Sequence, residues 1–343
     1  MTGRDRTVNR SFLVCGGCGF IGSNFTRSLR LRYPEAAITV VDLLTYAGSL
    51  DNLGDFVDTA GFEFVKADIS EFDTFTQFAS RAYDLVINFA AETHVDRSLY
   101  QPDIFARTNV LGVVNLLLFC RDRNIPFLQI STDEVYGPAR ADESFSEAAP
   151  LRPTSPYAAS KAAADLMVEA AISTFDQPAA IVRTSNNYGR WQFPEKLIPY
   201  FIYLARQNKP LPLYGDGSQR RCWIHVEDFC EALLRVVADF PTGEVYNIGG
   251  ANELTNLEVA ESLLRKIGGK SEVKLVPDRP GHDRAYRIDS SKYEAHYGSI
   301  KSRDFAAGLA ETIDWYLAHS DIFARLDTAE SRQFLDKHYR KHS

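Results

Sequence analysis

The stretch SFLVCGGCGFIGSNF, residues 11–25, decides the fold of this 343-residue chain. A mostly apolar run is followed by Gly16, Gly19 and Gly22, spaced three apart, and then by a helical pattern. Glycines at this spacing let a strand turn sharply into a helix, and they let a pyrophosphate approach the N–H groups at the helix N-terminus. A glycine-rich turn without a ligand would have the same pattern, so the rest of the chain has to supply the context.

Short apolar runs alternate with helix-length segments over the first half of the chain. The runs expected as buried strands are SFLVCGG, AITVVD, FEFVKAD, YDLVINFAA, FLQIST and AAIVRTSN. The segments expected as helices are Phe20 to Arg32, Phe72 to Arg81, Asp103 to Arg123 and Pro156 to Phe175. This alternation predicts an α/β fold, a Rossmann-type doubly wound parallel sheet that binds ligands at the carboxyl ends of its strands.

The character of the chain changes near residue 186, where Pro and Gly become frequent and helices alternate with irregular polar stretches. We expect a disordered leader over residues 1–10, a dinucleotide-binding domain over 11–185 and a smaller substrate-binding part over 186–343. Helices are expected at Glu195 to Gln207, Val226 to Ala238 and Thr255 to Ile267. The run GEVYNIGG is a candidate strand that returns to the main sheet, so the two parts should interleave.

Composition narrows the class of protein. The net charge is −7, and no basic stripe stands out, which argues against a nucleic-acid backbone as the ligand. No uninterrupted apolar run approaches the roughly 20 residues of a membrane helix, and the N-terminus lacks a signal-peptide core. Five cysteines, an odd number, do not form a secreted disulfide framework, so we expect a cytoplasmic protein. Cys15-x-x-Cys18 lies inside the glycine turn without a second pair, which indicates small-residue packing rather than a metal site.

An acidic residue follows the glycine turn at the distance that a dinucleotide site requires. Asp42 ends the second expected strand, 20 residues after Gly22, where a carboxylate accepts from ribose hydroxyls. Leu43 follows it in place of a basic residue, which favours NAD over NADP. Asp68 and Ile69 end the third strand and are placed to meet the adenine, although a helix N-cap explains Asp68 equally well.

A second group of reactive side chains lies further along the chain. Tyr157 and Lys161 are four residues apart and share one helix face, where the lysine charge can lower the phenol pKa from about 10. Ser131 ends the fifth strand, and Asp133 and Glu134 follow Thr132 directly. Two adjacent acids at a strand end suit one acid and one base with separated pKa values. An exposed helix start and a loop cap are the alternatives.

Nine motifs extend the pattern from one end of the chain to the other. They are GGCGFIGSNF, DLLTYAG, NFAAETHVDRS, STDEVYG, YAASKAAAD, SNNYGRWQFPEKLIP, YGDGSQRRCW, YNIGGANE and DRPGHDRAY. On these motifs the chain resembles the dTDP-glucose 4,6-dehydratases, NAD-dependent members of the extended short-chain dehydrogenase/reductase family. The glycine turn and Tyr-x-x-x-Lys are shared with epimerases and decarboxylases. The triplet Thr132-Asp133-Glu134 after Ser131 is a more specific mark of the dehydratases.

The resemblance implies a reaction in three stages. Tyr157, helped by Thr132, removes the O4 proton while NAD takes hydride from C4 of a nucleotide-bound glucose. Glu134 then removes the C5 proton as Asp133 protonates the leaving C6 hydroxyl. Hydride finally returns to C6, which gives a 4-keto-6-deoxy sugar nucleotide and regenerates the cofactor in place. NAD should therefore be tightly bound, and a homodimer with a four-helix interface is expected.

The resemblance also implies the full set of site residues, with no metal. The expected catalytic residues are Thr132, Asp133, Glu134, Tyr157 and Lys161. The expected cofactor residues are Gly16, Gly19, Phe20, Ile21, Gly22, Asp42, Leu43, Thr45, Asp68, Ile69, Ala90, Thr108, Ser131, Tyr157, Lys161 and Asn187. The expected substrate residues are His94, Thr132, Asn186, Lys196, Leu197, Pro212, Tyr214, Arg221, Asn256, Arg279 and His282.

Several alternatives stay open at this point. The same scaffold serves nucleotide-sugar C4 epimerases and UDP-uronate decarboxylases, and a 4,6-dehydratase can act on a UDP-linked sugar. Glu134 separates these enzymes, because an epimerase needs only to release and rebind a 4-keto sugar. A non-catalytic nucleotide-sugar binder is a further alternative, against which the intact set of reactive side chains argues.

Overall fold

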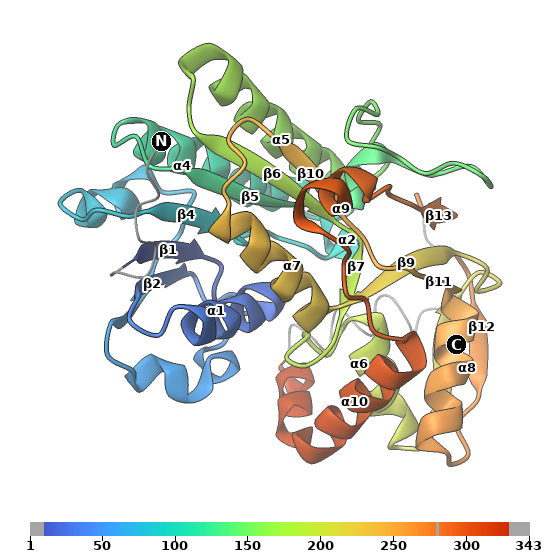
Figure 1. Cartoon of the computed structure of the whole chain (residues 1–343). Helices are drawn as coiled ribbons and strands as arrows, with labels where there is room; N and C mark the ends of the chain where they lie inside the picture. The colour runs from blue at the N-terminus through green and yellow to red at the C-terminus, as the bar shows by residue number, and fades with distance from the viewer. Residues whose placement is uncertain (1–9, 279–280, 329–343) are drawn as a thin grey trace.

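A computed structural model describes residues 10–278 and 281–328, and the expected leader lies almost wholly outside these residues. Its centre is a parallel seven-stranded sheet in the order β10-β6-β5-β4-β1-β2-β3 (Figure 1). The strands are β1 (Ser11–Cys15), β2 (Ala37–Asp42), β3 (Phe62–Lys66), β4 (Leu85–Asn88), β5 (Phe127–Thr132), β6 (Ala179–Thr184) and β10 (Val245–Ile248). The doubly wound α/β fold is confirmed, and the strand order reverses between β1 and β4, where such sheets bind ligands.

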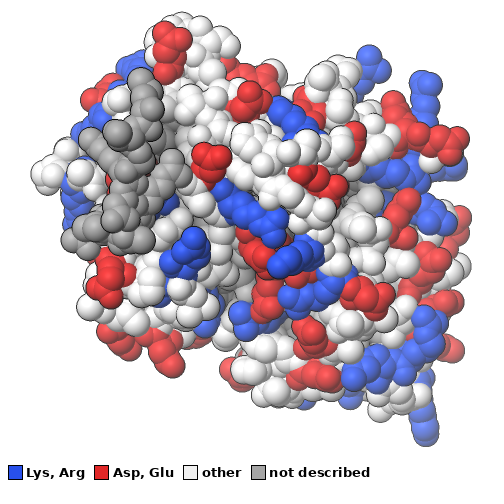
Figure 2. Space-filling model, in the orientation of Figure 1, with Lys and Arg blue, Asp and Glu red and all other residues white. Residues whose placement is uncertain are grey.

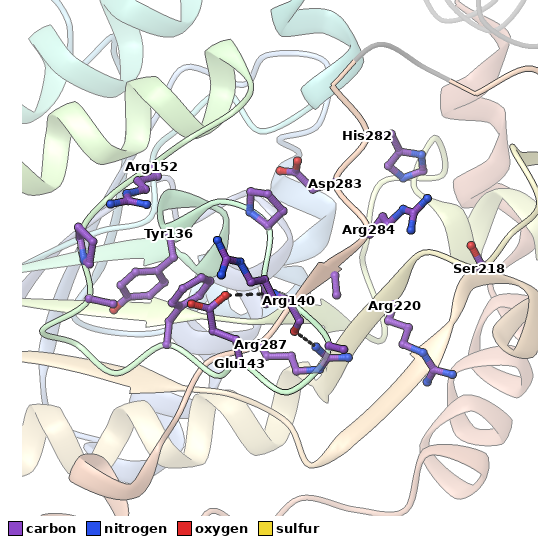
Figure 3. A pocket seen from close by; sticks show the side chains of 17 residues that line it. Tyr136, Arg140, Glu143, Arg152, Ser218, Arg220, His282, Asp283, Arg284 and Arg287 are labelled. Carbon is purple, nitrogen blue, oxygen red and sulfur yellow. Dashed lines mark hydrogen bonds between the residues drawn. The ribbon is translucent and has the colours of Figure 1, made fainter.

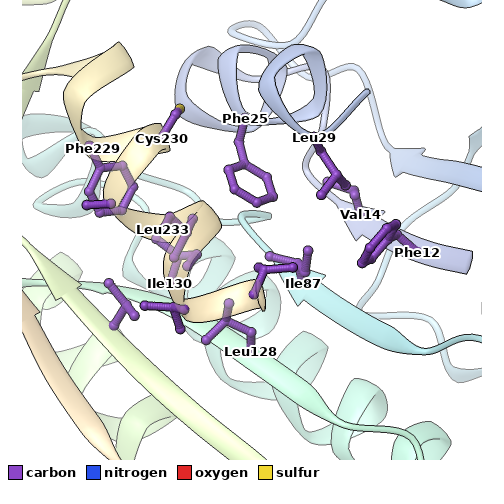
Figure 4. Close-up of a cluster of buried hydrophobic side chains, with 14 of the residues drawn as sticks. Phe12, Val14, Phe25, Leu29, Ile87, Leu128, Ile130, Phe229, Cys230 and Leu233 are labelled. Atoms are coloured by element: carbon purple, nitrogen blue, oxygen red, sulfur yellow. The ribbon is translucent and has the colours of Figure 1, made fainter. Parts of the chain in front are cut away.

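Helices cover both faces of this sheet (Figure 1). On one face lie α1 (Phe20–Arg32) and α7 (Val226–Ala238), and on the other lie α4 (Gly112–Arg121) and α5 (Pro156–Phe175). Figure 4 shows the first of the two resulting cores, in which α1, α7 and the strands contribute Phe12, Val14, Phe25, Leu29, Ile87, Leu128, Ile130, Phe229, Cys230 and Leu233. These side chains are almost fully buried, so large-to-small substitutions there should each cost about 2–5 kcal/mol.

The helix after the glycine turn shows how local chemistry sets element bounds. It begins directly after Gly19, without a side-chain cap, and its last turn carries Arg30 and Arg32. Cations there suit the negative end of the helix dipole. The Arg30 guanidinium donates 2.8 Å hydrogen bonds to the carbonyl oxygens of Pro34 and Ala36, just beyond the helix end.

The C-terminal part surrounds two smaller sheets. One contains β7 (Asn186–Tyr188), β9 (Arg220–His225), β11 (Asn252–Thr255) and β13 (Ala285–Tyr286), and the other pairs β8 (Leu211–Tyr214) with β12 (Val273–Val276). Its helices are α6 (Leu197–Ala205), α8 (Asn256–Ile267), α9 (Ser291–Tyr297) and α10 (Phe305–Ala318). Strand β10, in the expected GEVYNIGG run, does return to the main sheet and pairs with β6.

Two expected helices differ in the structure. The segment expected as a helix from Phe72 to Arg81 forms a 3₁₀ helix, η3 (Phe72–Phe78), whose Thr and Phe residues have modest helix propensity. The segment expected from Asp103 to Arg123 is divided into α3 (Pro102–Phe105), a π-helical turn η4 (Ala106–Leu111) and α4. Turns of the π type occur frequently at functional sites.

The run Pro102–Arg121 is long and apolar enough to cross a membrane by length and composition alone. Half of that window is buried inside the protein, and α4 packs against α5, as in the core helix of a globular domain. Among the described residues on the face drawn in Figure 2, basic and acidic side chains are interspersed.

The remaining short elements connect these layers. They are α2 (Val95–Ser98) and the 3₁₀ helices η1 (Leu50–Asn52), η2 (Gly54–Asp58), η5 (Asp133–Tyr136) and η6 (Ser320–Asp327). The helix η5 begins where β5 ends, at the carboxyl edge of the main sheet.

Candidate active site

Two acidic side chains are held at the end of β5 by a short hydrogen-bonded turn. The Thr132 hydroxyl accepts a 3.3 Å hydrogen bond from the Glu134 backbone N–H and lies 3.2 Å from Asp133 Oδ1, to which it donates. Asp133 is almost fully buried, and its Oδ2 has no hydrogen-bond partner among the described residues. The turn thus presents one buried carboxyl and its neighbour to the same space.

The electrostatics of this turn favour the protonated form of Asp133. Burial raises the pKa of Asp133 to about 7, the Glu134 charge adds to the rise, and Arg221 opposes it. Near neutral pH, Asp133 therefore holds its proton for much of the time. Such a carboxyl suits the role of a proton donor.

The Tyr–Lys pair lies on the first turns of α5. Ser155 caps this helix by accepting a 3.1 Å hydrogen bond from the Ala158 N–H, and Pro156 occupies the first helical position. The Lys161 ammonium reaches back to β5 and donates a 2.7 Å hydrogen bond to the Ile130 carbonyl. Burial lowers the pKa of Lys161 to about 8.

The phenol differs from the expectation that its pKa would be lowered. Burial and the Glu134 charge raise the pKa of Tyr157, while a hydrogen bond with Thr132 only partly offsets them. The ammonium of Lys161 is turned toward the Ile130 carbonyl, so it is not the dominant influence on the phenol. Tyr157 is thus a protonated phenol in the protein alone.

The expected cofactor residues line two adjoining cavities of about 90 and 260 Å³. The first contains Gly16, Gly19, Asp42, Leu43, Thr45, Asp68, Ile69, Ala90 and Thr108. The second contains Gly16, Gly19, Phe20, Ile21, Gly22, Ser131, Thr132, Tyr157, Lys161 and Asn187. A Cβ at Gly22 would overlap the Gly16 carbonyl oxygen, so the close packing of turn and helix requires glycine there.

The polar groups in these cavities fit a dinucleotide. Ser131 Oγ and Asn187 Oδ1 are buried and have no hydrogen-bond partner among the described residues. Asp42 accepts from the Cys18 and Leu44 N–H groups at 2.9 and 2.8 Å, which orients its carboxylate at the cavity. Asp68 accepts a 2.8 Å hydrogen bond from the Ser70 N–H in a local turn, and it is not a helix N-cap, because the N-cap of η3 is Glu71.

The expected substrate residues line a third cavity of about 200 Å³. They are His94, Asn186, Lys196, Leu197, Pro212, Tyr214, Arg221, Asn256 and His282, whereas Thr132 lines the cofactor side and Arg279 lies outside the described residues. The guanidinium of Arg221 is buried, and its Nη atoms donate to the backbone carbonyls of Arg220 (2.7 Å) and Asp283 (3.1 Å). No carboxylate of the described chain lies within ion-pair distance of it, which leaves its charge for an anionic ligand.

The cavities on the two sides share a border, and Glu134 lines both. Thr93, Asn186, Asn187, Gln192 and Lys196 are the other residues common to them. A ligand on one side can therefore reach the reactive group on the other past Glu134.

Sequence reasoning missed two residues of the substrate cavity. Glu195 is buried there, lies 3.7 Å from His94 Nε2 and forms an ion pair of 3.2 Å with Arg97. Tyr286 lies under the Arg221 guanidinium, 4.4 Å from it to the ring centre. Both lie within motifs quoted above, FPEKLIP and DRPGHDRAY. The motifs therefore contained these two residues, but no role in substrate binding was predicted for them.

The Cys-x-x-Cys pair is packed rather than reactive. Cys15 and Cys18 are fully buried, and burial raises the pKa of both thiols. In the described part of the chain, no cluster of His, Cys, Asp or Glu could hold a metal ion.

A doubly wound sheet with a Tyr–Lys pair at the carboxyl ends of its strands is the architecture of the extended short-chain dehydrogenases/reductases. The family model for GDP-mannose 4,6-dehydratase matches residues 13–312. The low-salt glycan biosynthesis protein Agl12 of Haloferax volcanii is 47% identical over 90% of this chain and 99% of its own. The dTDP-glucose 4,6-dehydratase of Streptomyces niveus is 44% identical over 89% and 92% of the two chains.

Solved structures agree with these similarities. A dTDP-glucose 4,6-dehydratase of Bacillus anthracis, in complex with NAD, has a TM-score of 0.85 at 40% identity and covers 91% of this chain and 98% of its own. One from Streptomyces venezuelae, also with NAD, has a TM-score of 0.86 at 41% identity with the same coverage. The chain belongs to the dTDP-glucose 4,6-dehydratase family, NAD-dependent hydro-lyases of the extended short-chain dehydrogenase/reductase type.

Proposed function

We propose that this protein converts dTDP-glucose into the 4-keto-6-deoxy sugar nucleotide and water by NAD-dependent 4,6-dehydration. The observation that carries the proposal is the position of buried Asp133 and half-buried Glu134, next to Tyr157 at the border of the cofactor and substrate cavities. The relatives named as dTDP-glucose 4,6-dehydratases support the substrate.

Oxidation at C4 comes first, because a hexose C5–H is not acidic until a ketone stands beside it. Tyr157 removes the O4 proton, and the Thr132 hydroxyl, which hydrogen-bonds the phenol, orients it. Bound NAD⁺ supplies the hydride acceptor and a positive charge to the site. That charge matters for Tyr157, because burial alone raises the pKa of this phenol.

Elimination then uses the two acids in different protonation states. Glu134 accepts the C5 proton, and Asp133, with its pKa raised to about 7, gives its proton to the C6 hydroxyl, which leaves as water. The resulting C5–C6 double bond takes hydride at C6 and a proton at C5, which Glu134 can return. The C5 proton thus passes to Glu134 and back, whereas Tyr157 ends with the O4 proton and Asp133 ends without its own. One proton therefore has to pass from Tyr157 to Asp133, directly or through solvent, before the next turnover.

The diphosphate of the substrate is assigned to Arg221. Its planar guanidinium is held by two backbone carbonyls and by the Tyr286 ring, so it is ordered before a ligand arrives. Asn186 Oδ1, which has no hydrogen-bond partner among the described residues, is a second polar group for the substrate. The other cavity residues, from His94 to His282, are proposed to bind the sugar nucleotide with them.

The fold by itself does not separate this reaction from epimerisation. The UDP-glucose 4-epimerase of Thermus thermophilus, in complex with NAD, has a TM-score of 0.81 at 29% identity. The pair Asp133 and Glu134 favours dehydration, because an epimerase needs no C5 base and no acid for a C6 hydroxyl.

We also propose a cytoplasmic homodimer. Apolar side chains that are 38–53% exposed lie on α3, η4 and α5, and these are Ile104, Leu111, Leu166 and Met167. Pairing these helices with those of a second copy would form a four-helix interface and remove the apolar side chains from water. The domain division near residue 186 stays a proposal, with β10 returning to the first part.

Incubation with dTDP-, UDP- and GDP-glucose tests the assignment. Alkali should develop the chromophore of a 4-keto-6-deoxy product, most rapidly with dTDP-glucose. Formation of a C4 epimer without chromophore would instead assign the protein to the epimerases. A preference for UDP-glucose would support the proposed dehydration but show that the nucleotide of the substrate is UDP.

A further inference from the structure

A larger cavity of about 1280 Å³ lies beside the substrate cavity (Figure 3). One side is the loop of residues 137–152, which follows the catalytic turn, and the other is formed by β9, β13 and the residues next to them. Five arginines line it, Arg140, Arg152, Arg220, Arg284 and Arg287, whereas its acidic lining is Glu143 and Asp283. The site thus concentrates positive charge in a chain whose net charge is −7.

The acidic groups nearby are already engaged. Asp283 accepts hydrogen bonds from the Tyr286 hydroxyl, at 2.8 Å, and from Thr154. Glu143 accepts from the backbone N–H of Arg140 at 3.0 Å, drawn as a dashed line in Figure 3. These carboxylates therefore stabilise the loop and strand around the cavity.

Four of the five guanidinium groups form no ion pair within the described residues, although the charge of Asp216 is close enough to act on Arg284 and that of Glu258 on Arg220. Arg287 forms an ion pair of 2.6 Å with Glu253. Within residues 10–278 and 281–328, Arg140, Arg152, Arg220 and Arg284 form no ion pair with a carboxylate. Figure 3 shows Arg140 and Arg152 on the loop side and Arg220 and Arg284 on the other. Mutual repulsion of these charges would fall if an anion with several charges bound among them.

The cavity shares a wall with the substrate cavity. Successive side chains of a strand point to opposite faces, and on β9 Arg220 faces the arginine-lined cavity while Arg221 faces the substrate. On β13, Ala285 pairs with Arg220 and faces the same way, whereas Tyr286 pairs with Arg221 and lines the substrate cavity. The two cavities are thus the two sides of one strand pair.

We propose that the arginine-lined cavity binds a small molecule that carries a diphosphate or triphosphate group, at a site separate from the substrate's own diphosphate. Planar guanidinium groups match phosphate oxygens two at a time, and several of them select a ligand with more than one phosphate. Phe145, which also lines the cavity, adds an aromatic surface for the rest of the ligand. Binding there acts on the wall that holds Arg221.

Inorganic pyrophosphate is a suitable probe, measured by titration calorimetry on NAD-loaded protein. An Arg221→Ser host removes the substrate's diphosphate partner, so the remaining binding reports the second cavity. Adding Arg220→Ser and Arg284→Ser to this host should weaken pyrophosphate binding at least tenfold. The matched control adds Arg265→Ser and Lys301→Ser, which remove two charges from exposed sites elsewhere, and should bind as the host does.

If the Arg221→Ser host does not fold, the cavity variant and the control can be compared in protein that retains Arg221. There, Arg220→Ser with Arg284→Ser should lose one of two pyrophosphate sites, and the control pair should lose none. Equal binding by the cavity variant and the control, or no pyrophosphate binding beyond the site of Arg221, would overturn the proposal. Neither outcome depends on turnover, so this experiment can fail while the proposed function is correct, and the reverse.

Discussion

Arg183 Nε donates a 2.8 Å hydrogen bond to Asp165 Oδ2, and both side chains are fully buried. Asp165 lies one turn after Lys161 on α5, and its charge opposes the lowering of the Lys161 pKa that burial causes. The other end of the guanidinium donates 2.9 Å to the hydroxyl of Tyr136, the last residue of the catalytic turn. This ion pair therefore connects the helix of the Tyr–Lys pair to the turn that carries the two acids.

Substituting Asp165→Asn should lower the free energy of unfolding by about 3–5 kcal/mol, because it leaves the buried Arg183 charge with only the half-exposed Glu169 as a counter-charge. The pKa of Lys161 should fall further, since the carboxylate that raises it is gone. Denaturant unfolding measures the first effect, and a shift in the pH dependence of C4 oxidation measures the second.

Glu169→Gln is the matched control for that substitution. Glu169 Oε1 lies 3.2 Å from Nη2 of the same guanidinium, but its side chain is 43% exposed. Solvent screens such a pair, so the cost should stay within about 1 kcal/mol. Similar costs for the two variants would show that burial does not decide the strength of this pair.

Asp133→Asn should stabilise the protein in a pH-dependent way. The pKa of Asp133 is raised by burial from 3.8 to about 7, so the unfolded chain ionises this group first, and stability falls as the pH rises from about 4 to 7. The amide removes that loss. The advantage of the variant should be near zero below pH 4 and reach roughly 2–4 kcal/mol above pH 7.

Unfolding free energies of the NAD-loaded protein, measured between pH 4 and 8, provide the test. Asp58→Asn is the matched control, because it makes the same change of charge at an exposed position in η2. A flat difference for Asp133→Asn across the same range would mean that its carboxyl titrates as in the unfolded chain.

NAD should remain with the protein through purification, because reduced cofactor made at C4 has to stay until C6 is reduced. Mass spectrometry of the denatured protein should find it in near-stoichiometric amount. Gly22→Ala should lose it, since the new Cβ would overlap the Gly16 carbonyl and displace the turn. Ser28→Ala, on the same helix but away from the cofactor cavities, should retain it.

The dimer can be tested at its apolar surface. Leu166→Glu places a charge where the side chain is 53% exposed on α5, and it should convert the dimer to a monomer in sedimentation at micromolar concentration. Leu31→Glu, at an even more exposed leucine on α1, should leave the dimer intact. A wild-type monomer under the same conditions would refute the interface.

Local motifs explain why so much of the site could be predicted. The glycine turn, Asp42, Ser131 and the Tyr–Lys pair each follow from spacing within one strand–turn–helix unit, and the structure places all of them around the cofactor cavities. The bounds of α1 and α5 were predicted for the same reason, since caps and apolar periodicity are local.

What could not be predicted depends on distant pairing and on burial. The arginine-lined cavity forms because β13 pairs with β9 from 65 positions further along the chain, Ala285 opposite Arg220. The raised pKa of Tyr157 comes from burial and from the Glu134 charge, which the Tyr-x-x-x-Lys spacing does not contain. Glu195 acquires its importance only when α2 brings His94 and Arg97 to it.

The substitution Glu134→Gln separates oxidation from elimination. The amide keeps the shape of the side chain but cannot take the C5 proton, so elimination should slow by roughly 10²–10⁴. Oxidation at C4 depends on Tyr157 and should largely survive. Reduced cofactor should therefore accumulate on the protein after substrate is added, visible by its near-ultraviolet absorbance in a stopped-flow experiment.

Tyr157→Phe is the opposing variant, because without the phenol the O4 proton has no acceptor and no reduced cofactor should form. The two variants thus give opposite absorbance signals, although both form the dehydrated product far more slowly than the wild type does. Turnover of Glu134→Gln at the wild-type rate would mean that the Glu134 side chain takes no part in the reaction and is only one residue of the turn that Thr132 caps. An epimerase on this scaffold would show that indifference, so the result decides between the two reactions that share the fold.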